Sequence, residues 1–187
     1  MELLSDFSCQ YIINSDDEIV FVNEDWQNFA VAANTPNLLS DKILQQSIWN
    51  FITDLSTIYL YREILKKVRT GDPIKFNIRC DSAEFKRLIE INISPQPNDG
   101  VHFENRILKM EKRSPQDILK IDIPRSGKIV VICSWCNRIN LEKNELVEIE
   151  SAVKDSEFFN QELLPQLSHG MCQDCFEKIS RQIDSVV

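Results

Sequence analysis

The chain has little glycine and almost no histidine. Only four glycines and two histidines occur among its 187 residues. A phosphate-cradling loop needs several closely spaced glycines, so nucleotide binding through such a loop is not expected. Two histidines are too few for a histidine-rich catalytic metal site, and no nucleophile elbow or paired-histidine hydrolase motif occurs. The sequence therefore predicts a protein that is not an enzyme.

Positive charge is also scarce. The formal net charge is −8 and the sequence pI is about 4.9. Both halves of the chain are acidic when it is divided at Gln116. Binding to nucleic acid or to anionic lipid needs a basic face, so no nucleic-acid partner is expected.

Long apolar runs are missing. No run approaches the roughly 20 residues needed to span a bilayer, so no membrane association is expected. The acidic start, Met1 to Asp6, lacks the basic and apolar regions of a signal peptide. The sequence thus predicts a cytoplasmic location, where paired cysteines serve as metal or redox sites rather than as structural disulfides.

Two C-x-x-C pairs near the C-terminus are the strongest chemical signal. Cys133 and Cys136 form the first pair, and Cys172 and Cys175 form the second. Each pair places two sulfurs on one tight turn, and four thiolates are a typical zinc site. Such a site has no open coordination position, so its zinc is expected to be structural. His169 is an alternative ligand, but the all-cysteine set is favoured because two equivalent turns are geometrically simpler.

Two readings of the four cysteines other than structural zinc stay open. They could be metal-free thiols packed in a small core, or a switch in which thiol oxidation releases the metal. Chance thiols rarely occur as two matched pairs, which favours zinc. The remaining thiols, Cys9 and Cys80, lie in strand-like stretches and are interpreted as small buried hydrophobes.

Local patterns predict two strands, several helices and three further strands, which is an α+β fold. Asn23 and Asp54 are expected to cap helices, and Gly71 with Pro73 to stop the second of them. Alternation predicts strands, and the predicted elements are strands at Cys9–Ile13, Glu18–Val22, Ile74–Cys80, Phe85–Ile93 and Val101–Met110, and helices at 23–33, 38–46 and 55–70.

The charged segment 113–128 contains proline and glycine and is predicted to be a linker. It separates a first domain, 1–112, from a zinc-binding C-terminal unit, 129–187. Within that unit we expect a strand at Ile129–Ile132 and helices at Leu146–Val153 and Phe176–Ile183.

The first domain resembles a PAS domain. The resemblance rests on the segment 11–26, where a strand and an acidic turn lead through I-x-x-V-N into a helix, and on the turn Ile48–Ile52. Arg79-Cys80-Asp81-Ser82 is similar to a strand end found in a PAS-like bacterial group. The resemblance implies a five-stranded antiparallel sheet with helices on one side. Arg79 and Asp81 share a strand face and are interpreted as a surface ion pair.

The C-terminal unit resembles a C-S-x-C-K-x-I … S-H-G-x-C-x-x-C tail attached to some bacterial sensory proteins. This chain departs from that pattern at Asn137, Leu146 and Gln173. The departures leave the four sulfurs intact, so they bear on the partner surface rather than on the metal.

An aromatic set in the first domain can line a pocket for a small apolar ligand, or can simply fill the core. Its members are Trp26, Phe29, Trp49, Phe51 and Phe76. The helical middle contains neither a histidine for haem nor a cysteine for flavin photochemistry.

Together these features predict a non-catalytic bacterial sensory module. It would bind a small ligand or a protein, carry structural zinc, and act through a separate signalling partner. The PAS resemblance further implies a homodimer. The alternative is a redox- or metal-responsive switch at the four cysteines.

Overall fold

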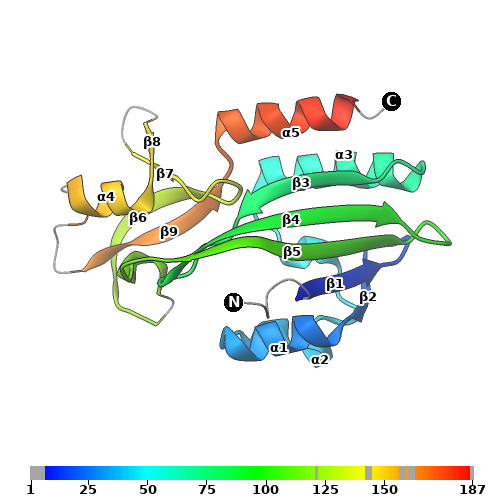
Figure 1. Ribbon diagram of the computed structural model, residues 1–187, viewed down its shortest axis with the longest axis horizontal. Helices are drawn as coiled ribbons and strands as arrows, with labels where there is room; N and C mark the ends of the chain where they lie inside the picture. Colours follow the sequence, from blue (N-terminus) through cyan, green and yellow to red (C-terminus); the bar gives the residue numbers. More distant parts are fainter. Residues whose placement is uncertain (1–6, 121, 142–144, 156–158, 160–162, 186–187) are drawn as a thin grey trace.

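The computed structural model describes residues 7–120, 122–141, 145–155, 159 and 163–185. The outermost residues of both predicted units therefore lie outside the described residues. Two β-sheets lie next to each other, and the last helix lies beside the long helix Leu55–Arg69 (Figure 1). None of the helices in the described part of the chain is long and apolar enough to cross a membrane.

The first sheet has five strands in the order β2-β1-β5-β4-β3, and every neighbouring pair is antiparallel. This confirms the predicted α+β class. The helical segments lie between β2 and β3 in the chain. The bounds are β1 (Ser8–Ile13), β2 (Ile19–Val22), α1 (Glu24–Ala32), η1 (Pro36–Leu38), α2 (Ser40–Ile43), η2 (Ile48–Asn50), α3 (Leu55–Arg69), β3 (Ile74–Arg79), β4 (Phe85–Pro95) and β5 (Val101–Lys112).

Both predicted helix caps are confirmed. Asn23 Oδ1 accepts a hydrogen bond from Trp26 N at 3.0 Å, and Asp54 Oδ2 accepts one from Thr57 N at 2.8 Å. Each bond satisfies a backbone donor that has no partner inside its own helix. Gly71 follows α3 with φ of 112°, a conformation that L side chains rarely adopt.

The predicted helix at 38–46 is wrong in extent. The segment forms only the short pieces η1 and α2. Gln45 N donates to Ile19 O at 2.8 Å, and Ile19 N donates to Gln46 O at 2.9 Å. Pairing with the start of β2 therefore takes the backbone groups that a longer helix would have used.

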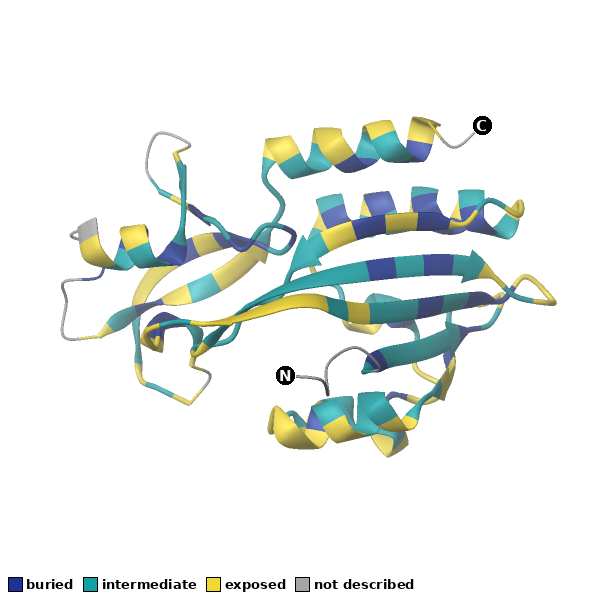
Figure 2. Cartoon of the chain, viewed as in Figure 1, coloured by how far each residue is buried: buried dark blue, intermediate teal, exposed yellow. Residues whose placement is uncertain are grey.

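One face of the five-stranded sheet is buried under the helices. Sheet residues such as Phe76, Ile93 and Phe103 pack into the same core as Leu60 and Ile64 of α3. Figure 2 shows these buried positions recurring along the central strands and α3. The helices thus cover the inner face, as the resemblance implied.

The second sheet has four strands in the order β8-β7-β6-β9. Strands β6 and β9 are parallel, whereas the other two pairs are antiparallel. It carries its own core, which includes Val130, Ile132 and Ile139. The bounds are β6 (Arg125–Cys133), β7 (Ile139–Asn140), β8 (Leu146–Val147), α4 (Ile149–Asp155), β9 (Leu164–Gly170) and α5 (Gln173–Ser185).

Two predictions for this unit need correction. The expected helix at Leu146–Val153 begins only at Ile149, because Leu146 and Val147 pair with β7. Strand β9 was not predicted at all. Its partner β6 is distant in sequence, so local periodicity carries little sign of the pairing.

The segment 113–128 packs against both units. Gln116 N donates to Ala83 O at 2.9 Å, beside the β3–β4 connection. Ile118 is 1% exposed and belongs to the core of the second sheet, and β6 already begins at Arg125 rather than at Ile129. The segment predicted as a linker is therefore held at several points.

The pair formed by Arg79 and Asp81 is real, but it is not a surface pair. The Asp81 side chain is 0% exposed, and Arg113, itself 5% exposed, lies 3.2 Å from the same carboxylate. Arg79 also contacts Glu148 at 2.7 Å, next to α4. Burial alone would lower the pKa of Arg79, but hydrogen bonds to Asp81 and Glu148 raise it above its usual value.

Lys86 and Glu150 extend this network across the boundary between the units. Lys86 Nζ lies 2.8 Å from Glu150 Oε1, which is 3.4 Å from Arg113 Nη1. The charges of the first sheet are thus matched by acidic residues at the start of α4. Asp81 and Arg113 are the buried members of this network, and breaking a buried pair leaves an uncompensated charge.

Replacing Asp81 with asparagine is expected to lower the free energy of unfolding by about 3 kcal/mol, because two arginines lose a buried partner. Urea unfolding would measure the change. The matched control is Glu90→Gln, whose partner Lys75 is 58% exposed. An exposed pair contributes at most about 1 kcal/mol. Equal losses in the two variants would contradict the assignment.

Candidate metal centre

The first cysteine pair lies on the turn between β6 and β7. Cys133 N donates to Arg138 O at 2.8 Å, and Asn137 N donates to Cys133 O at 2.9 Å. Asn137 has φ of 55°, a left-handed conformation that asparagine tolerates better than most residues. These bonds close a tight turn that brings Cys136 back beside Cys133.

The second pair lies where α5 begins. Cys172 precedes the helix, Cys175 lies in its first turn, and Phe176 N donates to Cys172 O at 3.0 Å. Strand β9 delivers this segment alongside β6, and Ser134 N donates to Gly170 O at 2.9 Å. The parallel pairing that the sequence did not reveal is thus what brings the two cysteine pairs together.

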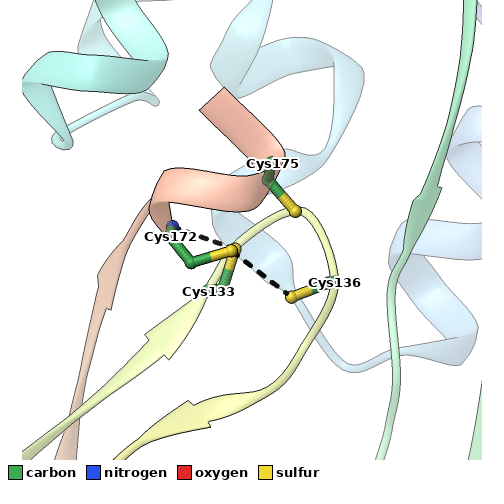
Figure 3. Close-up of side chains that lie close together, drawn as sticks. All are labelled: Cys133, Cys136, Cys172 and Cys175. Carbon is green, nitrogen blue, oxygen red and sulfur yellow. Dashed lines mark hydrogen bonds between the residues drawn. The ribbon is translucent and has the colours of Figure 1, made fainter. Parts of the chain in front are cut away.

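The four sulfur atoms fit one metal ion. All lie within 4.8 Å of one another, and Cys136 Sγ is 3.9 Å from Cys172 Sγ. A tetrahedral zinc with Zn–S bonds of about 2.3 Å places its sulfurs about 3.8 Å apart. Figure 3 shows the side chains converging from the β6–β7 turn and the start of α5. Four cysteines with this geometry would hold zinc as a closed, structural site.

The four thiols differ in the direction of their pKa shifts. Hydrogen bonds from Cys133 and Cys175 lower the pKa of Cys136 well below its usual value, with a further contribution from Arg138. Interactions with Cys133 and Cys136 raise the pKa of Cys175, and burial raises that of Cys172 to about 11. A metal that bound here through thiolate ligands would therefore displace protons from Cys172 and Cys175.

His169 lies outside this cluster. It does not belong to the one group of potential metal ligands found among the described residues, which consists of the four cysteines. Its exposed side chain instead lines a cavity of about 390 Å³ beside the turn.

Trp135, inside the first C-x-x-C, is buried in the core of the five-stranded sheet. Its side chain is 5% exposed, and its ring centroid lies 4.9 Å from that of Phe76 and 6.0 Å from that of Tyr61. The indole Nε1 donates to Thr57 Oγ1 at 3.3 Å. The metal-binding turn thus places an aromatic anchor in the first domain.

Backbone groups reinforce this anchor. Arg79 N, at the end of β3, donates to Trp135 O at 2.9 Å, and Asn137 Nδ2 donates to Arg79 O at 2.6 Å. The turn therefore caps the end of strand β3. The strand end at Arg79 and Asp81 and the β6–β7 turn thus contact each other directly.

Helix α5 makes a second contact with the first domain. Ile179 and Ile183 are buried in the same core as α3. Phe176 stacks on Tyr59 of α3 with ring centroids 6.2 Å apart. The cysteine cluster is thus flanked by two anchors, Trp135 on one side and α5 on the other.

The predicted aromatic pocket residues are dispersed. Trp26 and Phe51 line a cavity of about 110 Å³ between the helices and the sheet. Phe76 instead packs against Trp135. Trp49 donates its indole N–H to Asp17 Oδ2 at 2.8 Å, and Phe29 lies under the Arg87 guanidinium.

Sequence reasoning missed Trp135 as a contact residue, and it predicted the pair of Arg79 with Asp81 without its burial or its contact with Arg113. A tryptophan between two metal ligands is a signal in itself, because a purely structural turn does not need a large apolar ring. An acidic residue at a strand end between Arg79 and Arg113 gives no comparable signal, since the spatial arrangement of the two arginines depends on the fold.

Cys9 is expected to react with iodoacetamide on the order of 10³-fold more slowly than an exposed cysteine at pH 7, because only the thiolate reacts. Burial, together with Asp25 and Cys80, raises the pKa of Cys9 to about 12. Labelling followed by peptide mass spectrometry measures the rate. The denatured protein serves as the control, and rapid labelling of the native protein would contradict the assignment.

No protein-family model matches this chain, and no curated protein matches it either. Among solved structures it is similar to a sensory box sensor histidine kinase from Vibrio cholerae, at 13% identity over 56% of this chain and 83% of that one, with a TM-score of 0.39. It is also similar to a domain of the sensory box sensor histidine kinase/response regulator from Geobacter sulfurreducens, at 13% identity over 55% of this chain and 84% of that one, with a TM-score of 0.39. A third similar structure is the PAS domain of Bordetella pertussis BvgS, at 14% identity over 55% of this chain and 73% of that one, with a TM-score of 0.37.

Proposed function

We propose that this chain is a non-catalytic bacterial sensory module of the PAS type, and that structural zinc at Cys133, Cys136, Cys172 and Cys175 fastens its C-terminal unit. It would act in the cytoplasm through a separate signalling protein. The five-stranded antiparallel sheet with helices on one face supports the PAS resemblance. The convergence of the four sulfurs supports the zinc site.

The observation that carries the proposal is the burial of Trp135 in the sheet domain. A change in the packing around Phe76 or Tyr61 reaches the metal-binding turn directly, because Trp135 touches both rings. The C-terminal unit would therefore report the state of the first domain to a partner.

Native mass spectrometry of the purified protein tests the composition of the proposed module. We expect one zinc per chain and a homodimer, as the PAS resemblance implies. Hydrogen exchange with and without zinc tests the coupling. Loss of zinc should increase exchange in β3 and the start of α3, where Trp135 docks. Increased exchange confined to the β6–β7 turn and α5 would contradict the coupling.

A redox- or metal-responsive switch is the second candidate. It is favoured by the partial exposure of Cys136, Cys172 and Cys175, which leaves their sulfurs accessible to oxidants. Zinc and free thiols would be counted before and after mild peroxide. Retention of zinc with all four thiols reduced would reject the switch and leave a structural site.

A further inference from the structure

A second cavity lies at the seam between the sheet domain and the metal-binding turn. Its volume is about 390 Å³, within the range of small-molecule sites. Three of its lining residues, Phe51, Thr53 and His169, are exposed, so solvent reaches it. It is distinct from the 110 Å³ cavity, although Phe51 and Ile52 border both.

One acidic group and several aromatic rings line this seam cavity. Asp54 is its one carboxylate, and neither lysine nor arginine occurs among its described lining residues. Phe51, Tyr61 and Trp135 supply aromatic rings, which attract cations through their faces. His169 also lines the cavity, at its exposed edge. A cation with an apolar body can contact both the Asp54 carboxylate and the aromatic rings.

The hydrogen bonds of Asp54 leave it able to bind a ligand. Its Oδ2 accepts from Thr57 N at 2.8 Å and from Thr57 Oγ1 at 2.7 Å, so Oδ1 remains for a further donor. The N-terminus of α3 carries about half a positive charge, which the full negative charge of Asp54 exceeds. The Tyr61 hydroxyl donates no hydrogen bond to a described residue, and burial raises its pKa to about 12, so it stays a neutral donor.

We propose that the seam cavity binds a small protonated amine with an apolar body, held by Asp54 and the rings of Phe51, Tyr61 and Trp135. This inference rests on the proposed function, because it names the ligand class of the sensor.

The same cavity touches the metal-binding turn. Ser134 and Trp135, which lie between Cys133 and Cys136, form part of its wall. Two hydrogen bonds link the turn to the carboxylate. Trp135 Nε1 donates to Thr57 Oγ1, and Thr57 Oγ1 donates to Asp54 Oδ2. A ligand that packs on Trp135 favours the docked turn, so amine binding and metal retention become linked, and linkage is reciprocal.

The test uses the zinc-loaded 187-residue chain and 2-phenylethylamine as the probe, with phenylacetate as a control compound of similar size and opposite charge. The Trp135 indole N–H resonance, assigned with Trp135→Phe, reports occupancy. We expect saturable shifts with the amine and none with phenylacetate. Saturating amine should also slow zinc transfer to a chelator.

Asp54→Asn removes the charge while keeping an equally good helix cap. It should weaken amine binding about tenfold or more, because a charge-assisted contact is lost. Tyr61→Phe is a second variant, which removes the Tyr61 hydroxyl and keeps the aromatic ring. Asp41→Asn, at a 66%-exposed side chain, controls for general attraction to an acidic protein.

Equal binding of phenylacetate, or unchanged affinity in Asp54→Asn, would overturn the amine site. So would equal weakening by Asp41→Asn. None of these results touches the proposed function, which stands or falls on the response of β3 and α3 to zinc removal.

Discussion

Replacing Trp135 with alanine is expected to lower the free energy of unfolding by about 3–5 kcal/mol, the range for deleting a buried aromatic side chain. The ring is 5% exposed and packs on Phe76 and Tyr61 in the core of the first sheet. Its removal leaves a cavity between α3 and β3, and Thr57 loses one hydrogen-bond donor. Urea unfolding of the zinc-loaded protein would measure the loss.

The matched control is Trp135→Phe, which keeps an aromatic ring in the core and removes the indole N–H. It should cost less than alanine, with the lost hydrogen bond contributing about 1 kcal/mol. Zinc affinity should fall in the alanine variant as well, because the turn loses its anchor. Full stability in the alanine variant would mean that the turn does not dock on the sheet.

The importance of Trp135 follows from how the two units share one core. Cys133, Trp135, Ile179 and Ile183 belong to the same buried cluster as the helix-facing side of the five-stranded sheet. Although the sequence suggests a separate tail behind a linker, its burial makes it part of the first domain's packing. We therefore expect a single cooperative unfolding transition for the zinc-loaded chain.

The sequence was most informative where structure is set locally. Asn23 and Asp54 cap their helices as predicted, because a cap needs only the next three residues. The spacing of the cysteines likewise predicted a cluster that the structure brings together. The caps and each cysteine pair depend on neighbouring positions, whereas the meeting of the two pairs depends on the pairing of β6 with β9.

Contacts between distant segments were less accessible. The parallel pairing of β6 with β9 and the burial of Asp81 between Arg79 and Arg113 depend on the assembled fold. Strand propensity at Leu164–Gly170 is weak, and it becomes a strand through its partner. The metal turn's role as a strand cap could not be inferred from ligand spacing, which says nothing about what the intervening Trp135 touches.

Removing the metal is expected to have the second large effect. At free zinc a thousandfold above the dissociation constant, binding stabilises the native state by about 4 kcal/mol. Chelation should therefore lower the unfolding temperature and loosen the β6–β7 turn and the start of α5, whose cysteine sulfurs converge. Cys133→Ser should abolish stoichiometric zinc binding, because Cys133 is the buried ligand of the four. Cys80→Ser is the control that keeps all four ligands.

His169→Ala decides the ligand set. The His169 side chain lies outside the sulfur cluster, so the variant should retain one zinc with unchanged affinity. Loss of zinc in His169→Ala together with retention in a single cysteine variant would instead indicate a site of three cysteines and one histidine. The two outcomes are separated by metal analysis alone, and the observed convergence of four sulfurs within 4.8 Å favours the first, because no rearrangement of β9 is then needed.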